Sequence, residues 1–193
     1  MINALVAYVN TTSAGQSWIN STSTWINHVH QQHPAPLSIY TRIYFSTPQR
    51  PEIGPNTPFG AVAAGLGNIT SSSVEGQIYP AFKHGNADDV QLQKTRYYAG
   101  AGNGLEEILS SQGIDTVILS GIRTSGVIIS TAMRLFDLNY KVYVIADNVI
   151  ETGPDMGINQ AILEGVLPKL PVAGVISLEQ AIAALGRSGP AVY

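Results

Sequence analysis

The chain has 193 residues, a formal net charge of −3 and no cysteine, and only 12% of its residues are charged while 45% are hydrophobic. This length fits one domain with a single sizeable core, and so much apolar material excludes a disordered chain. Ten scattered basic residues, outnumbered by 13 acidic ones, leave no basic stripe for a nucleic acid, and the lack of cysteine excludes disulfides, thiolate zinc sites and thiol nucleophiles. We therefore expect residues 1–193 to form a single domain.

Short β-rich runs alternate with longer helical patterns along the chain. The runs are continuously apolar rather than alternating, which is typical of parallel strands covered on both faces. One of them, Gln91–Lys94, is weaker and shorter than the rest. In chain order the predicted strands are Ala4–Val9, Leu37–Tyr44, Gln91–Lys94, Thr116–Ser120, Lys141–Ala146 and Pro171–Ile176.

Helical patterns lie between these runs, and two of them carry clear capping signals. Asn103 and Ser177 can each cap the helix that follows, and Glu106 and Glu107 stand in a first turn, where the helix dipole favours acids. Strand–helix alternation predicts an α/β domain with a mostly parallel sheet. The predicted helices are Trp18–His33, Phe59–Leu66, Gly104–Ser111, Val127–Leu138, Asp155–Leu167 and Leu178–Leu185.

Two stretches depart from this pattern. Residues 46–89 are rich in Pro, Gly, Ser and Asn, and a loop of that length either has a function or contains small helices. The N-terminal apolar run covers only Ala4–Val9, too short for a signal peptide or a membrane span. We therefore expect a cytoplasmic protein with neither a membrane nor a nucleic acid as partner.

Open parallel sheets bind ligands beyond the carboxyl ends of their strands. Among the residues that follow the predicted strands, Lys94 and Arg123 are the only cations and Asp147 is the only acid. On position alone Lys94 reads as a solvated loop lysine, although a lysine in a cleft can hold a ligand oxygen. The segments this rule nominates are Asn10–Thr12, Phe45–Ser46, Lys94, Gly121–Gly126 and Asp147–Asn148.

The Gly121–Gly126 turn joins a buried strand to a helix. Free backbone N–H groups at such a helix start can bind an anion or an oxyanion. Thr124 or Ser125 can equally serve as the helix cap, and the two roles are compatible. Ser125 is disfavoured as a nucleophile because no nearby sequence supplies the histidine or carboxylate base that it would need.

Three further patterns point less clearly to a site. His28, His30 and His33 spread around a helix instead of sharing one face, so we expect surface histidines and no metal site. Gly100–Gly104 lacks the lysine and hydroxyl residue of a phosphate-binding loop and reads as a flexible turn.

Aromatic residues also stand at the strand ends. Tyr44, Tyr97 and Tyr98 either wall a ligand pocket or pack at the rim of the core, and the sequence does not decide between the two.

From Asp89 to Asp147 the chain resembles the isochorismatase-like hydrolase superfamily, which includes nicotinamidases and other cysteine hydrolases. The run VQLQKTRYYAGAGNGLEEIL is similar to that family's lysine-terminated strand, linking turn and helix start. The run GIDTVILSGIRTSGVIISTA, with KVYVIAD after it, resembles the family's strand–turn–helix–strand core. The opening run ALVAYV and the segment TRIYFSTPQRPEIGPNTPFGAVAAG fit one branch of the family, so the resemblance spans nearly the whole chain.

The resemblance implies a three-layer α/β/α sandwich around a six-stranded, mostly parallel sheet, and a homo-oligomer (a dimer or a tetramer). It also implies a site with an acid after the first strand, a lysine after the third and usually a cysteine at the helix start after the fourth. Members that cleave a vinyl ether dispense with the cysteine, because protonation by the acid is enough.

Transferred to this chain, the family site is incomplete. The lysine falls on Lys94, the cysteine position on Val127, and the acid position on Val9 or, with a shift of one residue, on Asn10. Valine can neither attack a carbonyl nor transfer a proton, and asparagine can orient a ligand but cannot act as a base near neutral pH. The family's metal motif near the second strand is missing as well, and no cofactor is implied.

Two functional hypotheses remain open. In the first, the protein acts on a small carbonyl- or carboxylate-bearing metabolite without a cysteine. Lys94 is then the electrophile or acid, Asn10 and Tyr97 or Tyr98 orient the ligand, and the turn from Arg123 to Gly126 donates to an oxyanion. In the second, the protein is an inactive relative that binds a small ligand or a protein partner. The candidate catalytic residues are Lys94 and Asn10, and the candidate ligand-binding residues are Tyr44, Tyr97, Tyr98, Arg123, Thr124, Ser125, Gly126 and Val127.

Overall fold

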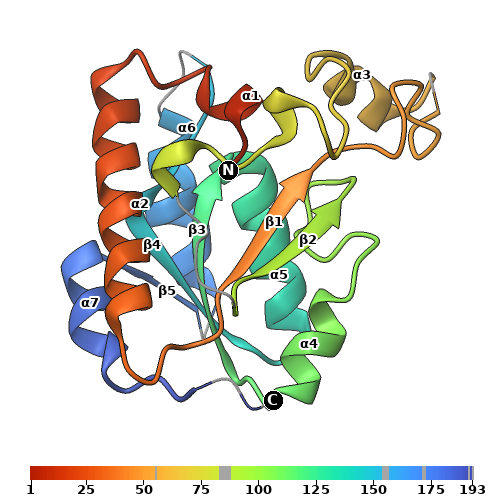
Figure 1. The fold of residues 1–193 in the computed structure, drawn as a ribbon. Helices are drawn as coiled ribbons and strands as arrows, with labels where there is room; N and C mark the ends of the chain where they lie inside the picture. The colour runs from red at the N-terminus through yellow and green to blue at the C-terminus, as the bar shows by residue number, and fades with distance from the viewer. Residues whose placement is uncertain (55, 83–87, 154–156, 171–172, 191, 193) are drawn as a thin grey trace.

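The computed structural model describes residues 1–54, 56–82, 88–153, 157–170, 173–190 and 192. Its strands form two parallel sheets (Figure 1). One sheet pairs β1 with β2, in register from Ile39 opposite Val90 to Ile43 opposite Lys94. The other has the order β3-β4-β5. The strands are β1 (Ile39–Ile43), β2 (Val90–Lys94), β3 (Thr116–Ile122), β4 (Lys141–Ile150) and β5 (Ala173–Ile176).

Helices cover both faces of the sheets. α2 and α7 lie on one side, and α4 and α5 lie on the other (Figure 1). α2 begins where the Thr12 hydroxyl accepts the Gly15 N–H, and its Trp18 and Ile26 share an apolar cluster with Ile122 and Ile150. The helices are α1 (Asn3–Val6), α2 (Ser13–Gln31), α3 (Pro58–Ala64), α4 (Leu105–Ser111), α5 (Ile129–Asp137), α6 (Gly157–Gln160) and α7 (Leu178–Leu185), with 3-10 turns at η1 (Val74–Gly76), η2 (Pro80–Phe82) and η5 (Leu167–Lys169) and π-helical turns at η3 (Thr124–Ile128) and η4 (Ala161–Val166).

The prediction of one six-stranded sheet is wrong: the described residues form five strands in two sheets. The missing strand is the predicted Ala4–Val9, which is helical in α1 and turns after it. Its amides bond locally, as when the Val6 N–H donates to the Ile2 carbonyl and the Asn10 N–H to the Val6 carbonyl. The apolar run is buried all the same, because Val6 and Val9 pack against α2.

The start of α2 lies directly against the end of this N-terminal turn. A Cβ at Gly15 would stand 1.9 Å from the Val9 carbonyl oxygen, so no residue larger than glycine fits there. The turn and α2 therefore form one packed unit.

A seam separates the two sheets. No strand pairing joins β1 to β3 in the described part of the chain. Ile118, in the middle of β3, is 37% exposed although its position in an apolar strand predicts burial. The two half-sheets therefore lie side by side without a shared backbone ladder.

The other predicted elements agree with the structure apart from their ends. α7 has the predicted bounds, and its Ser177 cap is confirmed by a reciprocal bond pair with Gln180. The N-cap of α4 is Gly104 and not the predicted Asn103, although the Asn103 side chain accepts the Leu105 N–H from one residue before the cap. Parts of two predicted elements, residues 155–156 and 171–172, lie outside the described residues.

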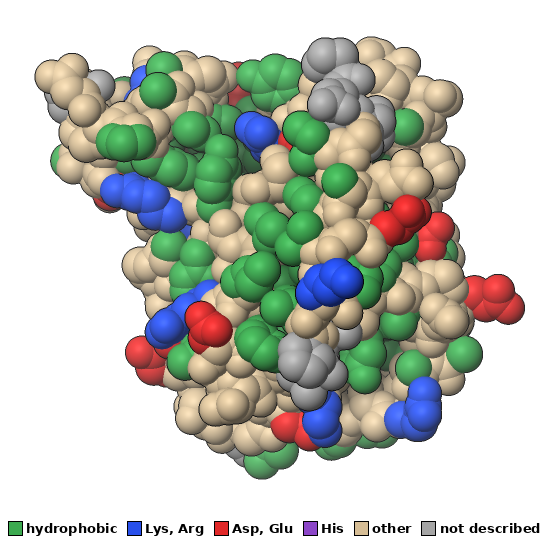
Figure 2. All heavy atoms as spheres, turned by 180° about the vertical axis from the view of Figure 1, so that it is seen from behind, with side chains coloured by type: hydrophobic (Ala, Val, Ile, Leu, Met, Phe, Trp, Pro, Cys, Tyr) green, Lys and Arg blue, Asp and Glu red, His purple; other side chains and the backbone are tan. Residues whose placement is uncertain are grey.

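The charged side chains are dispersed over the surface. Figure 2 shows a face on which Lys and Arg side chains are interleaved with Asp and Glu among apolar ones, without a continuous basic stripe. In the part of the chain that the structure describes, no helix is both long enough and apolar enough to cross a membrane.

Candidate functional site

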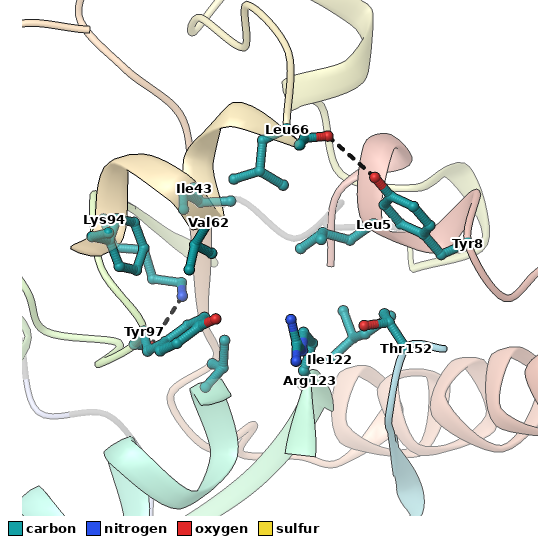
Figure 3. A pocket seen from close by; sticks show the side chains of 13 residues that line it. Leu5, Tyr8, Ile43, Val62, Leu66, Lys94, Tyr97, Ile122, Arg123 and Thr152 are labelled. Carbon is teal, nitrogen blue, oxygen red and sulfur yellow. Dashed lines mark hydrogen bonds between the residues drawn. The ribbon is translucent and has the colours of Figure 1, made fainter. Parts of the chain in front are cut away.

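A cavity of about 270 Å³ lies at the carboxyl ends of β1, β2 and β3 (Figure 3). Ile43 and Lys94 line it from the ends of β1 and β2, and Ile122 and Arg123 line it from the end of β3 and the residue that follows. The cavity therefore spans the seam between the two half-sheets. The remaining lining residues are Leu5, Tyr8, Phe59, Val62, Gly65, Leu66, Tyr97, Val127 and Thr152.

Lys94 is the most unusual of these residues. It is only 5% exposed, and its Nζ donates to the main-chain carbonyls of Arg96 and Tyr97, each at 3.1 Å. Burial lowers the pKa of Lys94 from 10.5 to about 8, because an ammonium group loses hydration in an apolar site. No carboxylate belongs to the cavity lining that the structure describes.

Arg123, the second predicted cation, is held by an acid that the sequence analysis did not nominate. Its Nε donates to Glu151 Oε1 at 2.8 Å, and the Glu151 side chain is 2% exposed. Burial would raise the pKa of Glu151, but the bonds from Ser125 and Thr152 and the charge of Arg123 outweigh burial and keep the pKa below its usual value. Glu151 is thus a buried carboxylate that neutralises Arg123.

The same carboxylate occupies the predicted anion site. Glu151 Oε2 accepts the Ser125 N–H at 2.8 Å, at the start of η3. Thr124 bonds the side chain of Asn159, and the peptide bond between Ile122 and Arg123 is cis. The Ser125 N–H is therefore already bound by Glu151 and is not available to a ligand oxyanion.

Of the three tyrosines predicted to bind a ligand, only Tyr97 lines the cavity. Tyr97 lines the cavity and points its hydroxyl inward (Figure 3). Tyr98 instead donates to Glu106 Oε1 at 2.8 Å, on the side of α4. Tyr44 stacks under the Arg42 guanidinium, 4.8 Å from its ring centre, and does not belong to the lining.

Two glycines make room for these rings. A Cβ at Gly126 would stand 2.9 Å from the Tyr97 ring, and a Cβ at Gly100 would stand 2.7 Å from the Tyr98 ring. Gly126 therefore shapes the cavity wall without lining it. Gly100 likewise leaves room for the Tyr98 ring.

Of the two positions that carry the family's acid and cysteine, one faces the cavity. Val127 lines it. Asn10 lies in the turn after α1, where its carbonyl accepts the Gln16 side chain, and it is not a lining residue. Thr124 and Ser125 also lie outside the lining.

The histidines on α2 do not gather. His30 bonds Asp89, 59 residues away in the sequence, from Nε2 to Oδ1 at 3.2 Å. Within the described ranges no three His, Asp or Glu side chains come together as metal ligands do.

Sequence reasoning missed two groups around the cavity. α3 and the residues after it supply Phe59, Val62 and Leu66, and the spacing of these apolar residues inside the long polar loop was the available signal. Tyr8, whose hydroxyl donates to the Gly65 carbonyl at 3.1 Å, links α1 to that segment (Figure 3). Residues 59–66 of the long loop region therefore shape the cavity.

Parallel strands with helices on both sides and a cavity at their carboxyl ends define an α/β fold of the kind that binds small ligands. The isochorismatase domain family matches residues 1–180 of this chain. The chain therefore belongs to the isochorismatase family, as the sequence resemblance predicted.

Solved structures share the fold at low sequence identity. An isochorismatase family protein from Burkholderia thailandensis is 22% identical with a TM-score of 0.71, covering 89% of this chain and 84% of its own. N-carbamoylsarcosine amidase from Thermoplasma acidophilum is 20% identical with a TM-score of 0.71, over 93% and 92%. A cysteine hydrolase from Pseudomonas syringae pv. phaseolicola is 18% identical with a TM-score of 0.76, over 97% and 89%. No protein with a curated description matches the chain.

Proposed function

We propose that the protein transforms a small carbonyl- or carboxylate-bearing metabolite in this cavity by a cysteine-independent mechanism centred on Lys94. The observation that carries the proposal is the placement of one buried lysine in an otherwise mainly apolar cavity, its Nζ fixed by two carbonyls at 3.1 Å. A flexible lysine loses conformational entropy when its amine is oriented for catalysis. In this protein the amine is already oriented by folding, so that entropy is not lost when a substrate binds.

Lys94 serves as the electrophile of this mechanism. When charged, its third N–H can donate to a substrate oxygen and stabilise the negative charge that develops there. The Arg123 guanidinium, whose Nε is engaged by Glu151, presents its other nitrogens to the cavity (Figure 3). Val127 gives this wall an apolar surface in place of a nucleophile.

A specific observation favours the alternative, an inactive relative that binds a ligand or partner. Glu151 already satisfies the Ser125 N–H and the Arg123 Nε. The turn then donates less to an oxyanion than the sequence suggested, while the cavity itself stays open to a ligand.

Turnover assays separate the two functions. The purified protein is incubated with panels of amides, esters, vinyl ethers and isochorismate, beside a Lys94→Arg variant that keeps the charge and a Lys141→Met variant at an exposed lysine. Turnover that is lost in Lys94→Arg and kept in Lys141→Met supports the proposal. Turnover that survives in Lys94→Arg contradicts it. No turnover together with a raised melting temperature in a small carboxylate or carbonyl compound supports the alternative.

A further inference from the structure

The Lys94 amine has a bonding geometry that suits attack on a ligand. A neutral amine has two N–H groups and one lone pair, and the carbonyls of Arg96 and Tyr97 account for both N–H groups. The remaining tetrahedral direction belongs to the lone pair. Because Lys94 lines the cavity (Figure 3), a molecule bound there would lie beside Nζ.

Burial favours the neutral form of the Lys94 amine. Burial alone brings the pKa of Lys94 to about 8. The nearby Met1 amine and Arg42 are also basic, and burial, followed by the charges of Lys94 and Arg42, lowers the pKa of the Met1 amine to about 5. The Arg123–Glu151 pair is neutral as a whole. A desolvated lysine of this kind is how proteins prepare an amine for covalent catalysis.

We propose that Lys94 forms an imine with a neutral aldehyde or ketone that carries a short apolar substituent. This inference rests on the proposed function, because it assigns the substrate class to the same lysine and makes the neutral form of that lysine the nucleophile, where the charged form is the electrophile. Lys94 Nζ attacks the carbonyl carbon, the nitrogen loses a proton, and the carbonyl oxygen gains one, giving a carbinolamine. The hydroxyl then takes a second proton and leaves as water while the C=N bond forms, and the resulting iminium nitrogen gives up its remaining proton to solvent. Amine and carbonyl are thereby converted to imine and water with no change of oxidation state.

The cavity walls select a neutral carbonyl compound over a charged one. Leu5, Phe59, Val62 and Leu66 provide an apolar surface opposite the strand ends. Neither the neutral amine nor the neutral imine of Lys94 would balance the charge of an anionic ligand, and Arg123 is already paired with Glu151. An unpaired buried charge is costly.

Tyr97 is placed to assist the departure of water. Its hydroxyl points into the cavity from the residue whose carbonyl holds Lys94 Nζ (Figure 3). A phenol can pass a proton to the leaving hydroxyl and be reprotonated from solvent. Tyr97 is thus a proton donor for the second half of the step.

Reductive trapping tests the proposal. Hexanal and cyanoborohydride are added to the intact protein near pH 7, and the sites of alkylation are mapped by peptide mass spectrometry over time. The chain has four lysines, Lys83, Lys94, Lys141 and Lys169, and the Met1 amine falls in a separate peptide. We expect Lys94 to be labelled at least about tenfold faster than Lys141, because a lowered pKa leaves more neutral amine.

The controls distinguish loss of imine formation from misfolding of a variant and from loss of turnover. Lys94→Arg keeps a charged donor but forms no imine, and it should lose the fast label, while Lys141→Met should keep it. Pyruvate in place of hexanal should label Lys94 more slowly. Labelling of Lys141 or Lys169 as fast as Lys94 in the wild-type map, which needs no variant to fold, overturns the proposal. If turnover depends on Lys94 but no adduct forms, the imine proposal is wrong and the proposed function stands. If a fast adduct forms but no carbonyl substrate is turned over, the proposed function is wrong and the imine proposal stands.

Discussion

The Glu151 carboxylate holds Arg123 by its Nε at 2.8 Å and, through its other oxygen, holds the Ser125 N–H at 2.8 Å. One acid at the end of β4 therefore fixes both the guanidinium beside the cavity and the first turn of the helix below it. The family resemblance implies an acid near the lysine, whereas the Glu151 carboxylate is bound to Arg123 and Ser125.

Replacing Glu151 with glutamine should lower the free energy of unfolding by about 2 kcal/mol, because a buried carboxylate with charged and main-chain donors is lost and its partners stay behind. Urea unfolding measures the loss. Asp115→Asn, which breaks the exposed pair with Lys141, should cause no measurable loss. Equal effects of the two substitutions would contradict a structural role for Glu151.

The same pair predicts an acid dependence of stability. The pKa of Glu151 is lower in the folded protein than its ordinary 4.5, so its contribution is complete above pH about 4.5 and disappears as pH falls through the folded value. The stability gap between wild type and Glu151→Gln should therefore narrow on acidification below pH 4.5. Denaturant titrations at several pH values show whether the gap stays constant, which would argue against this assignment.

Lys94 should also make stability rise with pH, but in an alkaline window. Its pKa is about 8 when folded and 10.5 when free, so the unfolded chain binds more protons between these values and stability rises with pH across that window. Relative to Lys94→Met, the wild type should gain about 3 kcal/mol between pH 7 and pH 11. Parallel curves for the two proteins would show that this amine has no lowered pKa.

The Val127→Cys variant tests whether the cavity lacks a base as well as a thiol. The natural chain has no cysteine, so the variant carries a single thiol whose labelling can be followed without background. We expect alkylation slower than in Val74→Cys, whose position is 71% exposed, and no hydrolysis of nicotinamide, since no described lining residue is a carboxylate base. Nicotinamide hydrolysis by the variant would mean that a base is within reach.

Gly126→Ala should deform the cavity wall from outside. Its Cβ would press on the Tyr97 ring at 2.9 Å, costing about 1–2 kcal/mol of stability and slowing hexanal labelling of Lys94. Gly165→Ala is the matched control, because it lies in a helical turn with open space around the new Cβ. Unchanged labelling in Gly126→Ala would separate Tyr97 from the reaction of the lysine.

Local signals in the sequence predicted most elements but misplaced the acid. The predicted strand Lys141–Ala146 stops four residues before β4 ends at Ile150, so the nominated acid was Asp147, which in the structure accepts the Leu178 N–H. The residue that follows the full strand is Glu151. Strand ends are set by the partners that continue the ladder, here Val149 and Ile150 beside β3, and these partners are not visible in a local pattern.

The run Ala4–Val9 shows the same limit in another form. Its apolar residues suit a buried strand or a buried helix of similar length, and periodicity does not separate short runs of this kind. The structure resolves it as α1 because Asn3 and Met1 bond the segment 77–79 and the chain then turns. Lys94, by contrast, was found from the strand-end rule and the family resemblance together.

The seam between β1 and β3 determines how the cavity can respond to change. Lys94 and Ile43 stand on one half-sheet and Ile122 on the other, and no ladder of strand hydrogen bonds couples the two within the described residues. The separation of the lysine from Arg123 is consequently governed by the packing of neighbouring side chains such as Leu5 and Phe59. Substitutions in α1 or α3 can widen or narrow the reaction space without touching either charged group, and the reach of the site toward larger or smaller carbonyl compounds is adjustable from these two short helices.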